Sequence, residues 1–155
     1  CYRLKIDWYF PRHEAVEKME QEKGLFSFRE SVENRLECCS IRKVEPLSRA
    51  LEGLSGWVTG IRREQSPTRS ELLAIETDMT NGGIIKINPL IALSEKQLTE
   101  YATAHNLPIN QLYNKGYRSI GCAPCTRAIG PCDQVREGRW WWENSEHKEC
   151  GLHRR

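Results

Sequence analysis

The sequence of 155 residues lacks several features that would assign it to a familiar class of protein. No apolar run approaches the roughly 20 residues that a membrane-spanning helix needs. The first residues, Cys1–Lys5, do not read into the apolar core of a secretory signal peptide. Basic residues number 23 and acidic residues 21, so the net charge of +2 gives little attraction for nucleic acid. We therefore expect a cytoplasmic protein that binds neither membrane nor nucleic acid.

Cysteine, by contrast, is abundant, with seven in the chain. A secreted disulfide scaffold is disfavoured because the number is odd and no signal peptide is visible. Two of the cysteines are adjacent, and adjacent cysteines seldom bridge each other because the geometry is strained. The composition therefore favours a metal or redox site over a disulfide framework.

Four cysteines form two close pairs, Cys38-Cys39 and Cys122-Ala123-Pro124-Cys125. Apolar residues at helical spacing from Val32 to Cys39 predict a helix that runs into the first pair, and Pro46 is expected to interrupt it. Adjacent side chains on a helix point about 100° apart, which suits a bulky cluster better than a single ion. The residues alone leave zinc, an iron–sulfur cluster and a purely structural role as buried thiols open.

Strands and helices alternate in the middle of the chain. The segments Trp57–Ile61, Glu71–Glu76 and Ile84–Ile87 predict strands, the first of them buried. Ser94-Glu95-Lys96-Gln97 matches a capping box, which predicts a helix that begins there. This mixture favours an α/β fold. After Gly116 the periodicity fades, and Cys, Arg and Trp dominate an irregular C-terminal segment.

Cys150 stands apart from the two pairs. His153 and Arg154-Arg155 follow it. Cationic neighbours lower the pKa of a thiol and raise its thiolate fraction, which favours a nucleophile over an inert cysteine. Cys132 has no obvious partner, and Cys1 is expected to be incidental.

Five segments in this order resemble the sulfonucleotide reductases, also called the PAPS reductase family. They are Glu37–Leu47, Thr59–Ser66, Gly121–Arg127, Arg136–Glu143 and Glu149–His153. The resemblance spans the chain from Glu30 onward. It implies an adenine-nucleotide α-hydrolase-like (PP-loop type) α/β domain, of which residues 1–155 form one partial domain. Residues 116–155 would be its cluster-binding and catalytic segment.

Within this family, members with both cysteine pairs resemble reductases of adenosine 5′-phosphosulfate (APS) that carry a [4Fe-4S] cluster. Members without the pairs reduce the 3′-phosphorylated substrate, PAPS. The resemblance therefore implies APS as substrate in assimilatory sulfate reduction and cysteine biosynthesis. It also implies a [4Fe-4S] cluster with the ligands Cys38, Cys39, Cys122 and Cys125.

The resemblance further implies that Cys150 attacks the sulfur of APS and forms an S-sulfonate. Thioredoxin or a similar dithiol then releases sulfite. Fixed cations must offset the charge of the substrate, and arginine forks suit phosphate and sulfate oxygens. The candidates for this role are Lys43, Arg62, Arg63, Arg136, Arg139 and His153.

The chain departs from the family pattern at its beginning. It does not start with Met, and it contains no phosphate-binding loop of the type Ser-Gly-Gly-x-Asp-Ser. We therefore expect an N-terminally truncated fragment that binds nucleotide weakly by itself. A PAPS-preferring or dual-specificity reductase and a non-catalytic zinc-binding module are the alternatives. The sequence leaves a homo-oligomer open.

Overall fold

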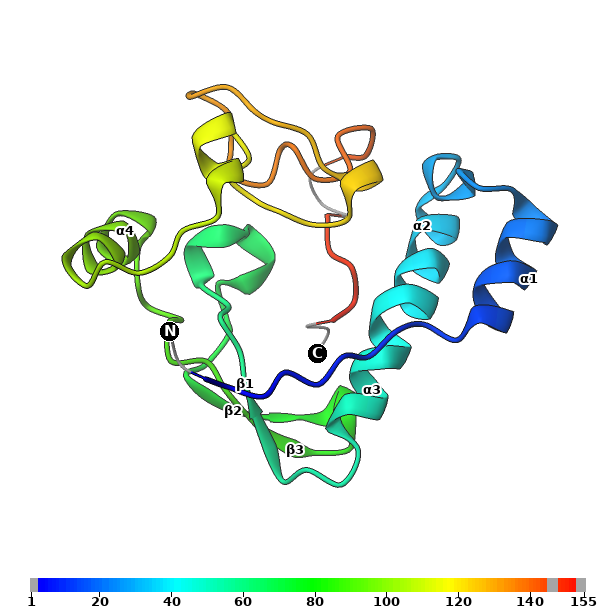
Figure 1. Ribbon diagram of the computed structural model, residues 1–155, viewed down its shortest axis with the longest axis horizontal. Coiled ribbons are helices and arrows are strands. Elements are labelled where there is room, and N and C mark those ends of the chain that lie inside the picture. Colours follow the sequence, from blue (N-terminus) through cyan, green and yellow to red (C-terminus); the bar gives the residue numbers. More distant parts are fainter. Residues whose placement is uncertain (1–2, 145–147, 153–155) are drawn as a thin grey trace. The chain divides into compact units, whose positions relative to one another are not determined.

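The computed structural model describes residues 3–144 and 148–152 (Figure 1). The chain divides into two compact units. The helical unit comprises Cys1–Ser55, Met79–Gly82 and Glu149–Arg155, and the sheet unit comprises Gly56–Asp78 and Gly83–Lys148. Among the described helices, none is long and apolar enough to cross a membrane.

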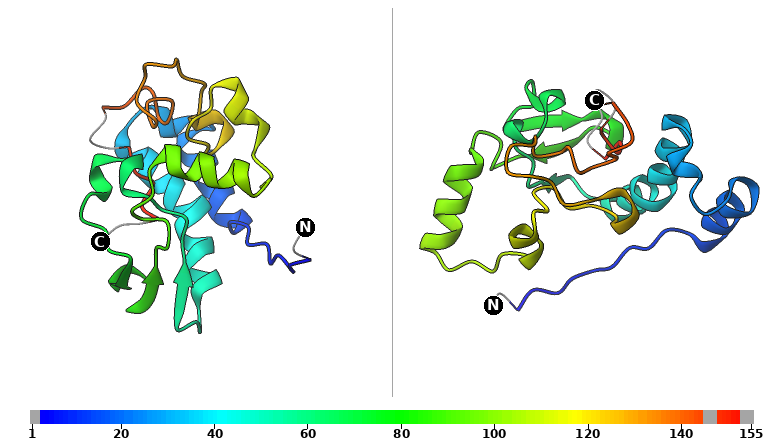
Figure 2. Two further views of the ribbon diagram at one scale, coloured as in Figure 1. Left: turned by 90° about the vertical axis from the view of Figure 1, so that its left-hand side faces the viewer. Right: turned by 90° about the horizontal axis from the view of Figure 1, so that it is seen from above.

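The helical unit is built on the helices α1 (His13–Lys23), α2 (Val32–Cys39) and α3 (Glu45–Leu51). Helices α1 and α2 lie side by side (Figures 1 and 2), and Lys23 donates a 2.5 Å hydrogen bond to the Glu37 carboxylate across them. Among the described residues of this unit, the buried apolar side chains include Met19, Phe28, Cys39 and Leu51.

Helix α2 has the bounds that its apolar spacing predicts, but Pro46 does not break the helical run. Ser40–Val44 form a π turn that leads directly from α2 into α3, and the Glu45 N–H donates to the Ser40 carbonyl five residues earlier. In a regular α-helix the Pro46 ring would collide with the carbonyl of Arg42, four residues before it. The wider π turn relieves that collision, so the helix continues.

The sheet unit contains the strands β1 (Gly56–Val58), β2 (Ile75–Asp78) and β3 (Ile84–Ile87) in the order β1-β3-β2. Strand β1 is parallel to β3, and β2 is antiparallel to it. Strand β3 has its predicted bounds. The other two are displaced, because β1 ends at Val58 instead of Ile61 and β2 begins at Ile75 instead of Glu71. The result is a small mixed sheet.

The two faces of this sheet are unusual in their polarity. Trp57, Lys86 and Glu76 are paired across the three strands in one row, and Val58, Ile87 and Ile75 form the next row. Lys86 is buried and ion-paired with Glu76 at 2.9 Å, whereas Val58 is 66% exposed. The prediction of a buried first strand is therefore wrong for Val58. Side chains alternate along a strand, and burial of the polar row turns the apolar row outward.

Burial of the Glu76 carboxyl by itself would raise its pKa. The hydrogen bond and charge of Lys86 outweigh this effect, and the net result is a lowered pKa of Glu76. Asn88, which is fully buried, also donates to the Glu76 carboxylate and to the Leu73 carbonyl. The polar row is therefore internally neutralised and hydrogen-bonded.

Helix α4 (Glu95–Ala104) begins at the predicted capping box. The Ser94 hydroxyl accepts from the Gln97 N–H at 3.1 Å, and the Gln97 side chain accepts from the Ser94 N–H at 2.9 Å. Six short 3-10 helices complete the described elements: Ser27–Arg29, Arg63–Gln65, Pro67–Arg69, Met79–Asn81, Gln111–Lys115 and Ala123–Cys125. Beyond Lys115 the described chain is otherwise irregular, as the loss of periodicity predicts. Helices combined with a small mixed sheet are consistent with the α/β class.

Candidate active site

The tandem cysteines lie at the C-terminal end of α2. Cys39 is buried and Cys38 is half-buried. Burial raises the pKa of Cys39 to about 11, although the charges of Lys43 and Arg35 oppose the rise. A thiol with this pKa stays protonated at neutral pH, and a metal ion that binds it has to displace the proton.

Lys43 lies in the π turn that follows the tandem cysteines. Its side chain is half-buried, and its positive charge is the largest of the influences that lower the pKa of Cys39. Turns of this kind occur frequently at functional sites, because the extra residue re-aims the side chains around it. The local distortion thus keeps a cation within electrostatic range of the Cys39 sulfur.

Cys150 belongs to the same helical unit, far along the chain. Arg35 of α2 donates from Nη1 to the carbonyl of Glu149 at 2.5 Å, across 114 residues of sequence. Gly151 is buried with φ 90°, a conformation that glycine adopts without strain. A charge on Cys150 contributes to the raised pKa of Cys39, so the two sulfurs lie within electrostatic range. The structure therefore brings the predicted nucleophile close to the tandem pair.

In the sheet unit, the second cysteine pair is joined by backbone contacts to the Arg/Trp-rich segment. Ala123–Cys125 form a 3-10 turn, and Cys125 is 7% exposed. The Cys125 carbonyl accepts from the Trp140 N–H at 3.1 Å, and Thr126 and Arg139 form an isolated antiparallel bridge. The two segments that the sequence shows separately are thus one local structure.

Two arginines flank the ring of Trp140, which is fully buried. The guanidinium carbon of Arg139 lies 4.4 Å from the ring centroid and that of Arg136 lies 5.8 Å from it. Trp140 has φ 41°, a left-handed conformation that costs a bulky residue about 1–3 kcal/mol and persists only where the surroundings enforce it. The buried Trp140 ring thus packs against both guanidinium groups.

The Arg139 side chain is itself buried, with 6% exposed. Its Nη1 donates to the Ile120 carbonyl at 3.3 Å, and among the described residues Nε meets no hydrogen-bond acceptor. Arg136 donates from Nη2 to the Lys148 carbonyl at 2.6 Å. Burial, with contributions from the charges of Arg127 and Arg136, lowers the pKa of Lys148. The carboxylates of Glu137 and Glu143 oppose this shift, so charges of both signs lie around this segment.

Arg62 and Arg63 are adjacent in sequence, yet their side chains have different surroundings. Arg63 donates from Nε and Nη2 to the Leu72 carbonyl, at 3.0 and 2.8 Å. Arg62 is 6% exposed, and its Nη1 lies 3.6 Å from the Glu64 carboxylate. Within the described part of the chain, Arg62 Nε has no acceptor. Arg63 is therefore engaged with the backbone, whereas Arg62 keeps a buried donor for another group.

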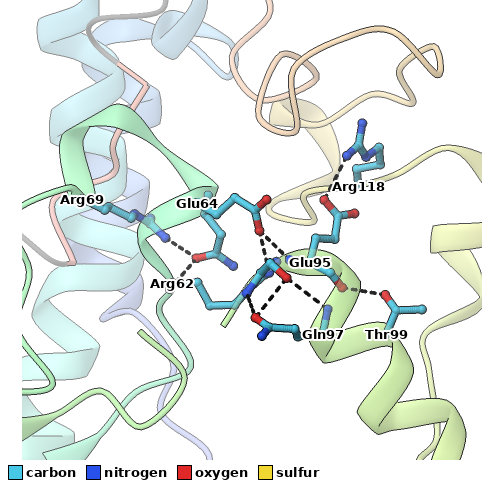
Figure 3. A network of polar contacts seen from close by, with 9 residues as sticks. Arg62, Glu64, Arg69, Glu95, Gln97, Thr99 and Arg118 are labelled. Carbon is cyan, nitrogen blue, oxygen red and sulfur yellow. Dashed lines mark hydrogen bonds and ion pairs between the residues drawn. The ribbon is translucent and has the colours of Figure 1, made fainter. Parts of the chain in front are cut away.

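The loop that carries Arg62 is fixed to the beginning of α4 (Figure 3). The Glu64 carboxylate accepts from the Glu95 N–H at 2.5 Å. The Gln65 side-chain oxygen accepts from the Arg62 N–H at 3.1 Å and from Arg69 Nη1 at 2.6 Å. The Gln65 N–H also donates to the Arg62 carbonyl at 3.3 Å, so the backbone of Arg62 is held at both its N–H and its carbonyl.

The sequence model of one protein family, the phosphoadenosine phosphosulfate reductase domain, matches residues 1–128 of the chain. The chain belongs to this family. The predicted resemblance to the sulfonucleotide reductases is thereby confirmed.

Reductases from bacteria are close relatives of this PAPS reductase family member. An adenosine 5′-phosphosulfate reductase from Allochromatium vinosum is 54% identical over 99% of the chain, and one from Burkholderia cepacia is 52% identical over 98% of it. The chain spans about 60% of the length of both relatives. The crystal structure of a phosphoadenylyl-sulfate (PAPS) reductase from Candida auris, a phosphate complex, matches with a TM-score of 0.53 and 34% identity. That match covers 68% of this chain and 48% of the other.

The four paired cysteines are the candidate ligands for a metal centre in this family member. Cys39 and Cys125 are buried, and Cys38 and Cys122 are half-buried. No group of three or more His, Cys, Asp or Glu side chains placed to hold a metal ion occurs among residues 3–144 and 148–152. Each pair alone thus has too few ligands for a closed four-ligand site, and four soft sulfur donors suit zinc or an iron–sulfur cluster. The donor chemistry of the four thiols fits such a centre.

Two buried arginines escaped the sequence analysis, namely Arg35 and Arg69. Arg35 occupies a core position of α2, on the same stripe as Val32, Leu36 and Cys39. A charged residue on the apolar stripe of a predicted helix is visible in the sequence and could have indicated a buried charge. Nothing in the local pattern distinguishes Arg69 from a surface arginine. His153, the remaining predicted substrate-binding residue, lies outside the described residues.

Proposed function

We propose that the protein reduces APS to sulfite and AMP in assimilatory sulfate reduction. The observation that carries this proposal is the near-complete coverage of the chain, at about half identity, by relatives named adenosine 5′-phosphosulfate reductase. We further propose a PP-loop type fold for the domain to which residues 1–155 belong, with residues 116–155 as its cluster-binding and catalytic segment, in the cytoplasm.

In the first step, the Cys150 thiolate attacks the sulfur atom of APS. A bond forms between Cys150 Sγ and that sulfur, and the bond from sulfur to the phosphate oxygen breaks. AMP leaves with the electron pair, and Cys150 carries an S-sulfonate. The step divides one difficult reduction into two easier displacements, which is the general advantage of covalent catalysis.

In the second step, a dithiol of the thioredoxin type supplies the two electrons. One of its thiolates attacks Cys150 Sγ and releases sulfite, which leaves a mixed disulfide. The second thiol of the donor resolves that disulfide, so Cys150 returns to a thiolate and the donor is oxidised. The balance requires no further oxidant or reductant.

The first step brings an anionic nucleophile to an anionic substrate, so fixed cations have to offset the repulsion. Arg62 and Arg139 are the strongest candidates, because each is more than nine-tenths buried and has an Nε without an acceptor in the described chain. A buried charged donor without an acceptor costs more than about 1–3 kcal/mol, and a bound oxyanion would remove that cost. Arg136, Lys43 and His153 complete the proposed set. Arg63, whose guanidinium donates to the Leu72 carbonyl, would instead stabilise the loop.

We infer that Cys38, Cys39, Cys122 and Cys125 hold a [4Fe-4S] cluster. Bound there, the cluster would supply structural and electrostatic stabilisation, because the dithiol already provides both electrons. Protein purified without oxygen is expected to contain about four iron and four acid-labile sulfide per chain. Replacement of Cys125 by Ser should lower both contents, whereas Cys132→Ser should not. Zinc without sulfide would instead favour a non-catalytic zinc-binding module.

Turnover of APS against PAPS tests the proposed substrate. We expect sulfite release from APS with reduced thioredoxin as donor, measured on the complete protein. Preference for PAPS is the second candidate, and the likeness to the PAPS reductase from Candida auris favours it. Equal or faster turnover of PAPS would support a PAPS-preferring or dual-specificity enzyme, and no sulfite from either nucleotide would contradict the proposal.

Gly121 offers a test of the Arg139 position. A Cβ atom on Gly121 would collide with the guanidinium of Arg139, which lies directly against it. Gly121→Ala is therefore expected to displace that guanidinium and to lower kcat/KM for APS roughly 10- to 100-fold, as small misplacements at active sites do. Gly130→Ala is the matched control, since its Cβ would meet only ordinary contacts of 3.4 Å or more to Asp133. Equal kcat/KM in both variants would argue against a role for Arg139.

A further inference from the structure

A buried charge lies on the apolar stripe of α2, and the hydrogen bond that it makes points to a function. Arg35 is 1% exposed, and its stripe neighbour Cys39 is 5% exposed. The two residues are one helical turn apart and therefore share a face of the helix. Burial of a guanidinium costs several kcal/mol unless hydrogen bonds satisfy it, so an apolar side chain would fill this position at lower cost.

The bond to the Glu149 carbonyl explains why an arginine is present. It is a charge-assisted bond of 2.5 Å to the residue that immediately precedes Cys150. Because the acceptor is a backbone oxygen, the bond fixes the main chain at Glu149 and thereby the origin of the Cys150 side chain. Gly151, buried and with φ 90°, turns the chain directly after Cys150. The thiol is thus held between a tether on one side and a turn on the other.

We propose that Arg35 is a positioning residue that docks the Cys150 segment on α2 for attack on the substrate sulfur. The inference rests on the proposed function, since it concerns the nucleophile of that reaction. Arg35 acts through the main chain and makes no contact with substrate. Its loss should therefore slow the transfer of the sulfonate group to Cys150 without weakening the binding of APS.

Single-turnover labelling with ³⁵S-labelled APS, in the absence of a dithiol, measures this transfer on the complete protein. Arg35→Gln is expected to slow S-sulfonation of Cys150 roughly 10- to 100-fold, because a misplaced nucleophile loses the benefit of orientation. The Kd for APS should stay within about threefold of the original value. Arg35→Lys keeps the charge and one donor but lacks the planar fork, so a smaller loss of about three- to tenfold is expected.

Arg49→Gln is the matched control, because Arg49 is also an arginine of the helical unit that donates to a distant carbonyl, that of Phe10 at 2.5 Å. We expect this variant to label at the original rate. The inference is overturned if Arg35→Gln labels at the original rate, or if Arg35→Gln and Arg49→Gln lose rate and melting temperature equally. Absence of label in the unaltered protein would contradict the proposed function itself, and with it this inference.

Discussion

Replacement of Cys150 by Ser is expected to reduce sulfite formation from APS by about 10⁴-fold or more, since covalent catalysis fails without its nucleophile. A serine hydroxyl is almost entirely protonated at neutral pH and is a far weaker nucleophile than a thiolate. The nearly equal size of the two side chains should leave the binding of APS intact. Sulfite release and the mass of the protein after exposure to APS, with or without one added SO₃ group, measure the two consequences.

Cys132→Ser is the control for this experiment. Cys132 is exposed and forms no disulfide with another described cysteine, so its replacement should change neither the rate nor the added mass. If the Cys150 variant released sulfite at the original rate, or if the SO₃ group were found on another cysteine, the proposed nucleophile would be wrong.

Arg62→Gln is expected to lower kcat/KM for APS roughly 30- to 1000-fold. This corresponds to a loss of about 2–4 kcal/mol of transition-state stabilisation, the range for loss of a buried charged partner. The Arg62 guanidinium is buried, and its Nε has no acceptor among the described residues to compete with a substrate oxygen. Steady-state kinetics with APS measures the effect. Inhibition by AMP separates loss of phosphate binding from loss at the sulfate group.

Arg63→Gln is the neighbouring comparison. Its side chain donates two hydrogen bonds to the Leu72 carbonyl, so its loss should lower the free energy of unfolding by about 1–3 kcal/mol. We expect kcat/KM to change by less than about threefold. The reverse result, with Arg63→Gln the more damaging to kcat/KM, would assign the substrate contact to Arg63 instead of Arg62.

Elements that depend on neighbours in sequence were predictable. The capping box Ser94-Glu95-Lys96-Gln97 predicts the beginning of α4, because each of its bonds joins residues three apart. The apolar spacing from Val32 to Cys39 likewise predicts α2, since its period is that of the helix. Strand β3 has its predicted bounds, Ile84–Ile87, with Gly82 and Gly83 as the turn before it.

Elements whose form depends on distant contacts were predicted less well. The run Trp57–Ile61 gives only the three-residue strand β1, because the following Thr59 and Ile61 turn toward Asn88 and the small core of Leu72 and Ile91. Pro46 predicts an interruption of the helix that begins at Val32, yet the helical run continues through the π turn Ser40–Val44 into α3. Periodicity does not report which face of a sheet will be covered, and so it did not predict an exposed Val58 beside a buried Lys86.

By itself, the sequence determined the chemistry that is available to this protein. Four paired thiols, a separate Cys150 and arginine-rich segments are properties of residue type and spacing, and they were sufficient to identify the family. Only the tertiary structure decided that Arg63 binds a backbone carbonyl while Arg62 keeps a buried donor, and that Arg35 contacts Glu149 across 114 residues. The physical reason is that the environment of a buried charge is set by groups that folding brings to it, and such groups are distant in sequence.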